Sequence, residues 1–220
     1  MAISNPAITR ELANQLALRQ RIAWCCSVAQ GVMKSYSDYY RRTYKIDEAL
    51  RLAWDFASRT ANDANTRAAL QEQIGELSER GDNEGYGFPV VLIGSNILEE
   101  IRENDGKAAY AAVDDSAFAF ANLQLYRHNL SPGAQGVRGQ YRDYIEASAK
   151  VVTDFALRAY QHYRNLPENR ISRQTAYSEE LKPPPFPFQG VVPGAGEGFP
   201  KAPINEVTPE RRTGDPLQDW

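Results

Sequence analysis

The sequence contains few residues of the types that build disulfides and metal sites. It has only two cysteines, Cys25 and Cys26, and they are adjacent. This excludes a disulfide framework and a site made of several thiolates. We interpret both cysteines as small apolar core residues. Neither His128 nor His162 follows a glutamate by three residues, as the ligands of di-iron helical bundles do. We therefore expect no metal ion and no cofactor.

Long apolar runs and an excess of basic charge are also missing. No stretch approaches the roughly 18 apolar residues of a membrane span, and the N-terminus lacks the basic and apolar regions of a signal peptide. The chain has 25 basic and 28 acidic residues, a net charge of −3, which argues against binding to nucleic-acid phosphates. We expect a cytoplasmic protein with neither a membrane nor a nucleic acid as partner.

Proline is scarce in most of the chain and abundant at its end. Nine of the 13 prolines and five of the 15 glycines fall within 183–220, a composition typical of irregular segments. The same segment has more apolar anchors, such as Phe186 and Phe199, than a solvated linker needs. The predicted organisation is a helical domain, 1–182, with a Pro/Gly-rich tail, 183–220, packed on it as a strap.

The helical domain shows the 3.6-residue apolar periodicity of helices and almost no strand alternation. A first helix is predicted from near Pro6 to Met33, and a second with Asp47 as its cap. Further helices are predicted over about 65–80, from Pro89 to the break at Gly106, over about 107–128 and over about 138–165. The predicted fold is all-α: a six- or seven-helix, bundle-like single domain with an irregular C-terminal tail.

Six acidic residues of this domain are the candidate partner-binding residues: Glu99, Glu100, Glu103, Asp105, Asp114 and Asp115. The first four predict a solvated acidic face. Such a face suits a basic partner, because charge complementarity speeds association and sets specificity.

Asp114 is different, because it lies one turn from both Tyr110 and Phe118 and so falls on an apolar row. A buried acid needs a partner, and arginine is the usual one. A structural ion pair with an arginine is the main interpretation of Asp114, and a functional acid is the alternative. Asp115 lies off this row.

No catalytic constellation is visible, and the two glycine clusters lack the strand and the Lys-Ser/Thr ending of phosphate-binding loops. The sequence therefore predicts a protein that is not an enzyme. A site assembled from scattered Tyr, Asp and Arg side chains stays open as an alternative.

Several features occur in a suggestive order over about residues 20–125. They are Arg21-Ile22-Ala23-Trp24-Cys25-Cys26, Tyr36 and Tyr39, the helix from Asp47 to Trp54, Tyr86-Gly87-Phe88-Pro89, and the small-residue helix around Ala112, Val113 and Ser116. This order resembles a family of small all-helical bacterial proteins that includes immunity proteins of polymorphic toxin systems. The resemblance implies a cytoplasmic protein that binds a toxin domain and blocks it, with no chemistry of its own.

The leading functional hypothesis is therefore a non-enzymatic immunity protein that neutralises a cognate protein toxin in bacterial competition. The alternative is a helical scaffold or adaptor. In that case the Pro-rich tail, with its Pro184 to Pro187 PxxP spacing, would dock a second protein.

Overall fold

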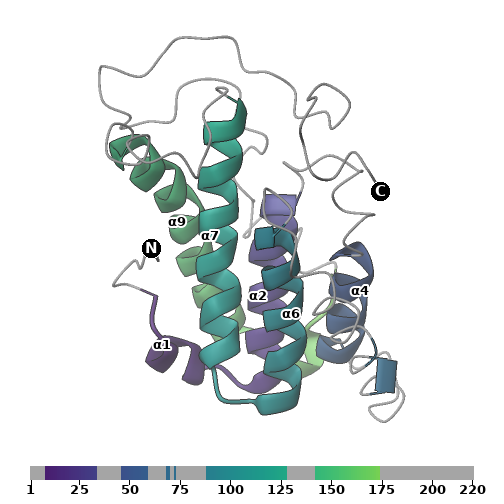
Figure 1. Ribbon diagram of the computed structural model, residues 1–220. Coiled ribbons are helices and arrows are strands. Elements are labelled where there is room, and N and C mark those ends of the chain that lie inside the picture. Colours follow the sequence, from purple (N-terminus) through teal and green to yellow (C-terminus); the bar gives the residue numbers. More distant parts are fainter. Residues whose placement is uncertain are drawn as a thin grey trace.

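The computed structural model describes residues 8–33, 46–58, 68–69, 72, 88–127 and 142–173. Within these residues the chain forms six α-helices and one short 3-10 helix, and no strand (Figure 1). The predicted all-α fold is confirmed. No helix of the described part is long and apolar enough to cross a membrane. The predicted tail and its boundary after residue 182 lie outside the described residues.

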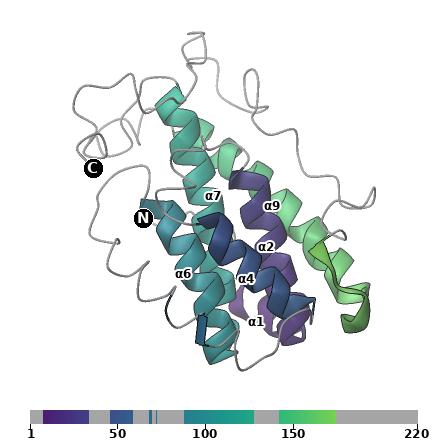
Figure 2. The ribbon, with the colours of Figure 1, turned by 90° about the vertical axis from the view of Figure 1, so that its right-hand side faces the viewer.

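The helices are α1 (Arg10–Asn14), α2 (Leu18–Met33), α4 (Ile46–Ala57), α6 (Phe88–Glu103), α7 (Lys107–Arg127) and α9 (Arg142–Asn165), followed by the 3-10 helix η1 (Glu168–Arg170). The helix α2 is central and packs against α4, α6, α7 and α9. Figure 1 and Figure 2 show these four helices arranged around it. Twelve of the sixteen residues of α2 are buried in consequence.

The interface between α2 and α9 is built from aromatic side chains whose polar ends are satisfied. The Trp24 and Tyr160 rings meet edge to face at 6.1 Å between centroids, and Trp24 Nε1 donates a hydrogen bond to the Ala156 carbonyl over 2.8 Å. The Tyr163 and Ser27 hydroxyls are 2.7 Å apart. These bonds matter because a buried polar group without a partner costs roughly 1–3 kcal/mol.

The central position of α2 also determines the environment of its two adjacent cysteines. Adjacent helical residues point about 100° apart, which predicts that at most one of them packs well in the core. Both Cys25 and Cys26 are buried, because neighbouring helices cover α2 on several sides. Burial raises the pKa of both thiols, so they stay protonated and act as core residues.

The predicted continuous helix up to Met33 is wrong, because the chain turns between Asn14 and Leu18. The hydroxyl of Thr9 caps α1 by accepting from the Leu12 amide over 3.1 Å. The side chain of Gln20 accepts from the Ala17 amide over 2.9 Å, as the glutamine of a capping box does. Local capping therefore splits one apolar stripe into two helices.

Other predicted boundaries are closer to the structure. Pro89 does lie in the first turn of its helix, and the chain does break at Gly106, which has a φ of +75°. Asp47 lies inside the first turn of α4 rather than before it, so the prediction that it caps this helix is wrong. Most of the helix predicted over 65–80 lies outside the described residues.

Candidate functional site

The six acidic candidates do not form a single face. Glu99 and Glu103 lie on the surface of α6, Glu100 is buried beneath them, Asp105 lies in the α6–α7 turn, and Asp114 and Asp115 lie half-exposed on α7. Their environments therefore have to be considered separately, because exposure and hydrogen bonding decide whether a carboxylate is free to meet a partner.

Glu100 contradicts the prediction of a solvated acidic residue, because its exposed fraction is 0%. It follows Ile97 by one turn and precedes Ile101, both on the buried face of α6. One of its carboxylate oxygens, Oε1, lies 2.9 Å from Nε of Arg21 on α2, whose own exposed fraction is 4%. The buried acid with an arginine partner is thus Glu100, not Asp114.

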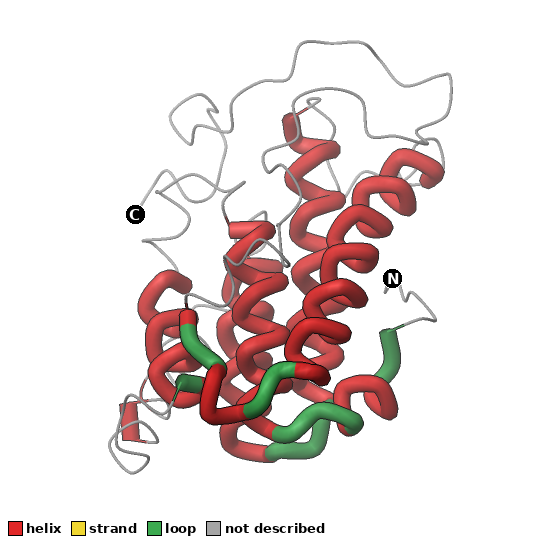
Figure 3. The backbone as a smooth tube through the Cα atoms, turned by 180° about the vertical axis from the view of Figure 1, so that it is seen from behind, coloured by secondary structure: helices red, strands yellow, loops and turns green. Residues whose placement is uncertain are grey.

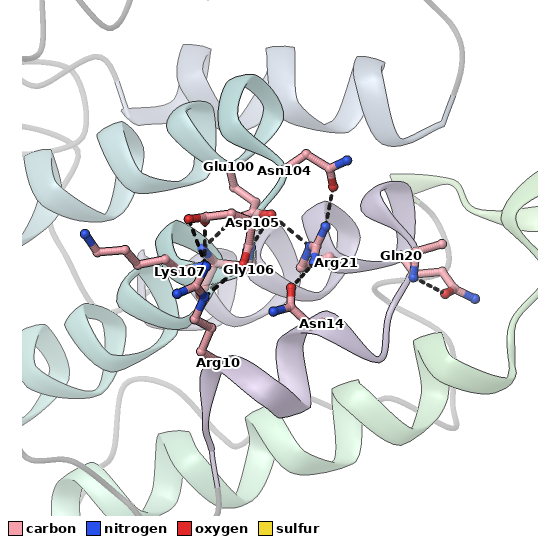
Figure 4. A network of polar contacts seen from close by, with 12 residues as sticks. Arg10, Asn14, Gln20, Arg21, Glu100, Asn104, Asp105, Gly106 and Lys107 are labelled. Atoms are coloured by element: carbon pink, nitrogen blue, oxygen red, sulfur yellow. Dashed lines mark hydrogen bonds and ion pairs between the residues drawn. The ribbon is translucent and has the colours of Figure 1, made fainter.

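The Glu100 carboxylate also holds the start of α7. Its Oε1 accepts from the Gly106 amide over 3.1 Å, and its Oε2 accepts from the Ala109 amide over 3.0 Å (Figure 4). These amides belong to the helix N-terminus, where backbone donors have no partner within the helix. Burial raises the pKa of Glu100, while the amides and Arg21 act in the opposite direction.

Arg21 extends the same network to two asparagines. Its guanidinium donates to Asn14 Oδ1 over 2.8 Å and also to Asn104 Oδ1. Asn104 itself has a φ of +52°, a backbone conformation that asparagine adopts more readily than most residues. We call Asn14, Arg21, Glu100, Asn104 and Gly106 the buried brace, because they join α1, α2, α6 and the α6–α7 turn around the buried Arg21–Glu100 pair; the two asparagines are its exposed ends.

The α6–α7 turn favours glycine at position 106, because its φ of +75° strains other residues and the Asn14 side chain lies close by. A Cβ added there would lie 2.3 Å from Asn14 Oδ1, far inside contact distance. The turn and the helices that the brace joins are seen from behind in Figure 3, at the lower end of the bundle.

Asp105, also a predicted partner-binding residue, is engaged within the same turn. Its Oδ1 accepts from the Lys107 amide over 2.8 Å, which caps α7. The Arg10 side chain donates to the Asp105 carbonyl over 3.1 Å and to its Oδ2 over 3.3 Å. Asp105 thus stabilises the ends of α1 and α7 from the outside of the brace.

Glu99 and Glu103 lie on the surface, as predicted, with side chains 42% and 51% exposed. Both pair with Arg102, at 3.2 Å and 2.7 Å between nitrogen and oxygen. Exposed pairs of this kind contribute about 0–1 kcal/mol. The arginine offsets part of their negative charge.

On α7 the residues that keep solvent exposure follow one helical row. From 107 to 123 they are Lys107, Tyr110, Ala111, Asp114, Asp115 and Phe118, and every other residue of this stretch is buried. We call these six residues the α7 stripe. The row with Tyr110, Asp114 and Phe118 that looked like a core stripe is therefore the outer edge of the helix.

The two aspartates of the α7 stripe are poorly compensated. Burial and the neighbouring Asp114 charge raise the pKa of Asp115 to about 6, against the effect of a 2.7 Å hydrogen bond from Asn96 Nδ2. Burial also raises the pKa of Asp114. In the described part of the chain neither aspartate forms an ion pair, so the arginine partner predicted for Asp114 is not found there.

Asp114 lines a small hollow together with Tyr110, Ile8 and Thr153. Burial and the Asp114 charge raise the pKa of the Tyr110 hydroxyl, which therefore stays protonated near neutral pH. A protonated phenol beside a carboxylate that forms no ion pair with a described residue can accept or donate a hydrogen bond. The arrangement suits the binding of a basic or hydrogen-bonding group.

Sequence reasoning missed the buried brace, although one signal was present. Arg21 directly precedes the largely apolar stretch from Ile22 to Ala29 of α2, and a charged residue buried there needs a counter-charge. Its partner is 79 residues away in the chain and therefore not deducible from local spacing. Among the described residues no group of three or more His, Cys, Asp or Glu side chains is placed to hold a metal ion.

Comparison of the chain with protein-family models, curated proteins and solved structures finds no match.

Proposed function

We propose that the protein is a non-enzymatic binding protein of the cytoplasm, and specifically an immunity protein that binds and neutralises a cognate bacterial toxin. The observation that carries the binding proposal is the pair Asp114 and Asp115. Both are partly buried and neither forms an ion pair with a described residue, and the charge of the chain's amino terminus offsets only part of the burial effect on the pKa of Asp114. The immunity role is supported by the family resemblance of residues 20–125.

A partly buried carboxylate without a counter-ion is costly to the free protein and favourable for a basic partner. Part of its hydration has already been lost on folding, so a partner's lysine or arginine regains electrostatic energy without the full cost of desolvation. Tyr110 and Phe118 flank the two aspartates on the α7 stripe. Aromatic residues beside a charge are the composition of protein-binding hot spots.

The other acidic candidates have secondary roles in this proposal. Glu99 and Glu103, on the neighbouring α6, act as an acidic rim that attracts a basic surface over a distance. Glu100 and Asp105 hold the α6–α7 turn and do not contact the partner. A toxin with a basic surface is therefore the partner that this face fits.

Co-expression tests the immunity role. Cells that express the candidate toxin from the neighbouring gene should survive only when this protein is also present. If cells die equally with and without it, the immunity role is wrong.

Charge variants test the binding face separately. Asp114→Lys combined with Asp115→Lys should abolish protection, since the partner's cations would meet like charges. The matched control is Glu48→Lys combined with Asp55→Lys on α4, which also replaces two acids but leaves the α7 stripe intact. Equal protection by both double variants would show that the α7 stripe is not part of the interface.

A further inference from the structure

The C-terminal part of α9 carries a hollow of about 300 Å³ that the proposed toxin contact does not use. It is lined by Arg158, Gln161, His162, Asn165 and Leu166. The first four are spaced i, i+3, i+4 and i+7, so they share one face of the helix. The hollow is therefore formed by α9 and by Leu166, the residue that directly follows it.

Contacts to α2 hold the base of this hollow in place. The carbonyl of Leu166 accepts a hydrogen bond from Gln20 Nε2 over 3.0 Å, and its amide donates to the Tyr163 carbonyl over 3.2 Å. Tyr163 is fully buried and bonded to Ser27 through its hydroxyl. The end of α9 thus has a defined position relative to α2.

The described lining contains one guanidinium, one imidazole and two amides, and no carboxylate. Asp154 precedes Arg158 by four residues, the usual spacing for a helical ion pair. Both of its oxygens instead contact Lys150 Nζ, at 2.6 and 2.8 Å. Within the described residues Arg158 forms no ion pair, and its guanidinium lies 5.9 Å from the centroid of the Phe155 ring.

Helix polarity explains only part of this positive charge. Cations in the last turn of a helix are favoured by the helix dipole, which accounts for Arg164. Arg158 lies about two turns before the end of α9, beyond the reach of that effect. Arg158 is exposed, so its guanidinium is accessible to a ligand.

We infer that this hollow is a binding site for a small oxyanion, a carboxylate or a phosphate group, held by Arg158. A guanidinium donates two parallel hydrogen bonds to either group. Gln161 and Asn165 add amide donors beside it, and Leu166 offers an apolar contact to the rest of the ligand. The site is separate from the α7 stripe, so it does not depend on the toxin proposal.

The test is a titration of the ¹⁵N-labelled full chain with sodium phosphate and, in a second arm, with sodium butyrate, at constant ionic strength kept with sodium chloride. We expect saturable shifts of the amide signals of 158–166 with at least one probe. Saturation with phosphate alone assigns the site to phosphates, and saturation with butyrate alone assigns it to carboxylates. Non-saturating shifts with both probes would overturn the inference.

Two variants distinguish a built site from general basic charge. Arg158→Gln should weaken binding about tenfold, the loss expected for one charge-assisted hydrogen-bond pair. Arg164→Gln removes the same charge from the same helix but outside the lining, and should leave the affinity unchanged. Equal affinities of the two variants would refute the role of Arg158. Gln161→Glu, which places a negative charge at the rim, should weaken binding independently.

Discussion

The buried brace and the α7 stripe use the same chemical group, a carboxylate withdrawn from water, in opposite ways. Glu100 in the brace accepts two backbone hydrogen bonds and contacts Arg21, so the protein itself compensates its charge. In the described structure the two aspartates of the stripe accept a single side-chain hydrogen bond, which Asn96 donates to Asp115. Compensation within the chain marks a structural acid, and its absence marks an acid that a partner can use.

The difference follows from position relative to the helix ends. Glu100 faces the first turn of α7, where free amides are available. Asp114 and Asp115 lie in the middle of α7, where every backbone amide is already bonded within the helix. A mid-helix carboxylate can be compensated only by side chains or by another molecule.

The largest effect should come from breaking the brace with Glu100→Leu. Removing the carboxylate leaves Arg21 buried without its counter-charge and two amides without acceptors, a loss of about 3–5 kcal/mol in the free energy of unfolding. Urea denaturation measures it. Arg21→Met combined with Glu100→Leu should cost less than Glu100→Leu alone, because no buried charge remains. A single variant as stable as the wild type would show that the brace is dispensable.

Gly106→Ala should also destabilise the brace, by about 1–3 kcal/mol, because alanine is strained at positive φ. The new methyl group would in addition meet the Asn14 side chain. Thermal unfolding measures the change. Adding Asn14→Ala removes the overlap, so the difference between the single and double variants separates the steric contribution from backbone strain. If Gly106→Ala has the same melting temperature as the wild type, the inferred close packing of the turn is wrong.

The α7 stripe should respond to pH in a defined direction. The pKa of Asp115 is raised from 3.8 to about 6, so the folded state binds more protons than the unfolded state in this window. The stability from this group is present below pH 3.8 and is lost as the pH rises through 6.

Asp115→Asn should therefore stabilise the protein at pH 7.5 by about 1–2 kcal/mol, because the partly exposed carboxylate keeps some of its hydration. It should have no such benefit at pH 3.5. Urea denaturation at both pH values checks this. An equal change in the free energy of unfolding at pH 7.5 and pH 3.5 would contradict the view that Asp115 is ionised and poorly compensated at neutral pH.

The smallest effect on stability is expected at the acidic rim. Glu99→Gln combined with Glu103→Gln breaks two exposed pairs with Arg102 and should change the free energy of unfolding by less than about 0.5 kcal/mol. The same variant should slow association with a basic partner, most visibly at low salt. Stopped-flow binding separates the two effects. A large loss of stability would show that Glu99 and Glu103 have a structural role, as the residues of the brace do.

Much of the helical architecture follows from local pattern. The apolar periodicity of α4, α6, α7 and α9 and the breaking residues Pro89 and Gly106 predict these helices to within a few residues. The break between α1 and α2 was missed, because the apolar stripe continues through it and only the capping bonds at Thr9 and Ala17 interrupt it.

The candidate site was predicted less well for a related reason. Six acids are visible in the sequence, but the side of each helix that faces the core depends on its neighbours. Glu100 looks like its exposed neighbours Glu99 and Glu103 until α2 and α7 are packed against α6. Asp114 looks buried because Tyr110 and Phe118 share its row, yet that row is the edge of α7 that the other helices leave open.

Composition and apolar periodicity are enough to establish an all-helical body, the scarcity of cysteine and histidine, and the set of acidic residues worth testing. Periodicity and composition are local properties, so the chain reveals them without its fold. Which acid is compensated depends on the packing of the helices, since Arg21 and Glu100 are 79 residues apart and meet because α2 lies at the centre of the bundle. Compensation requires contact, and contact between distant residues is created by packing.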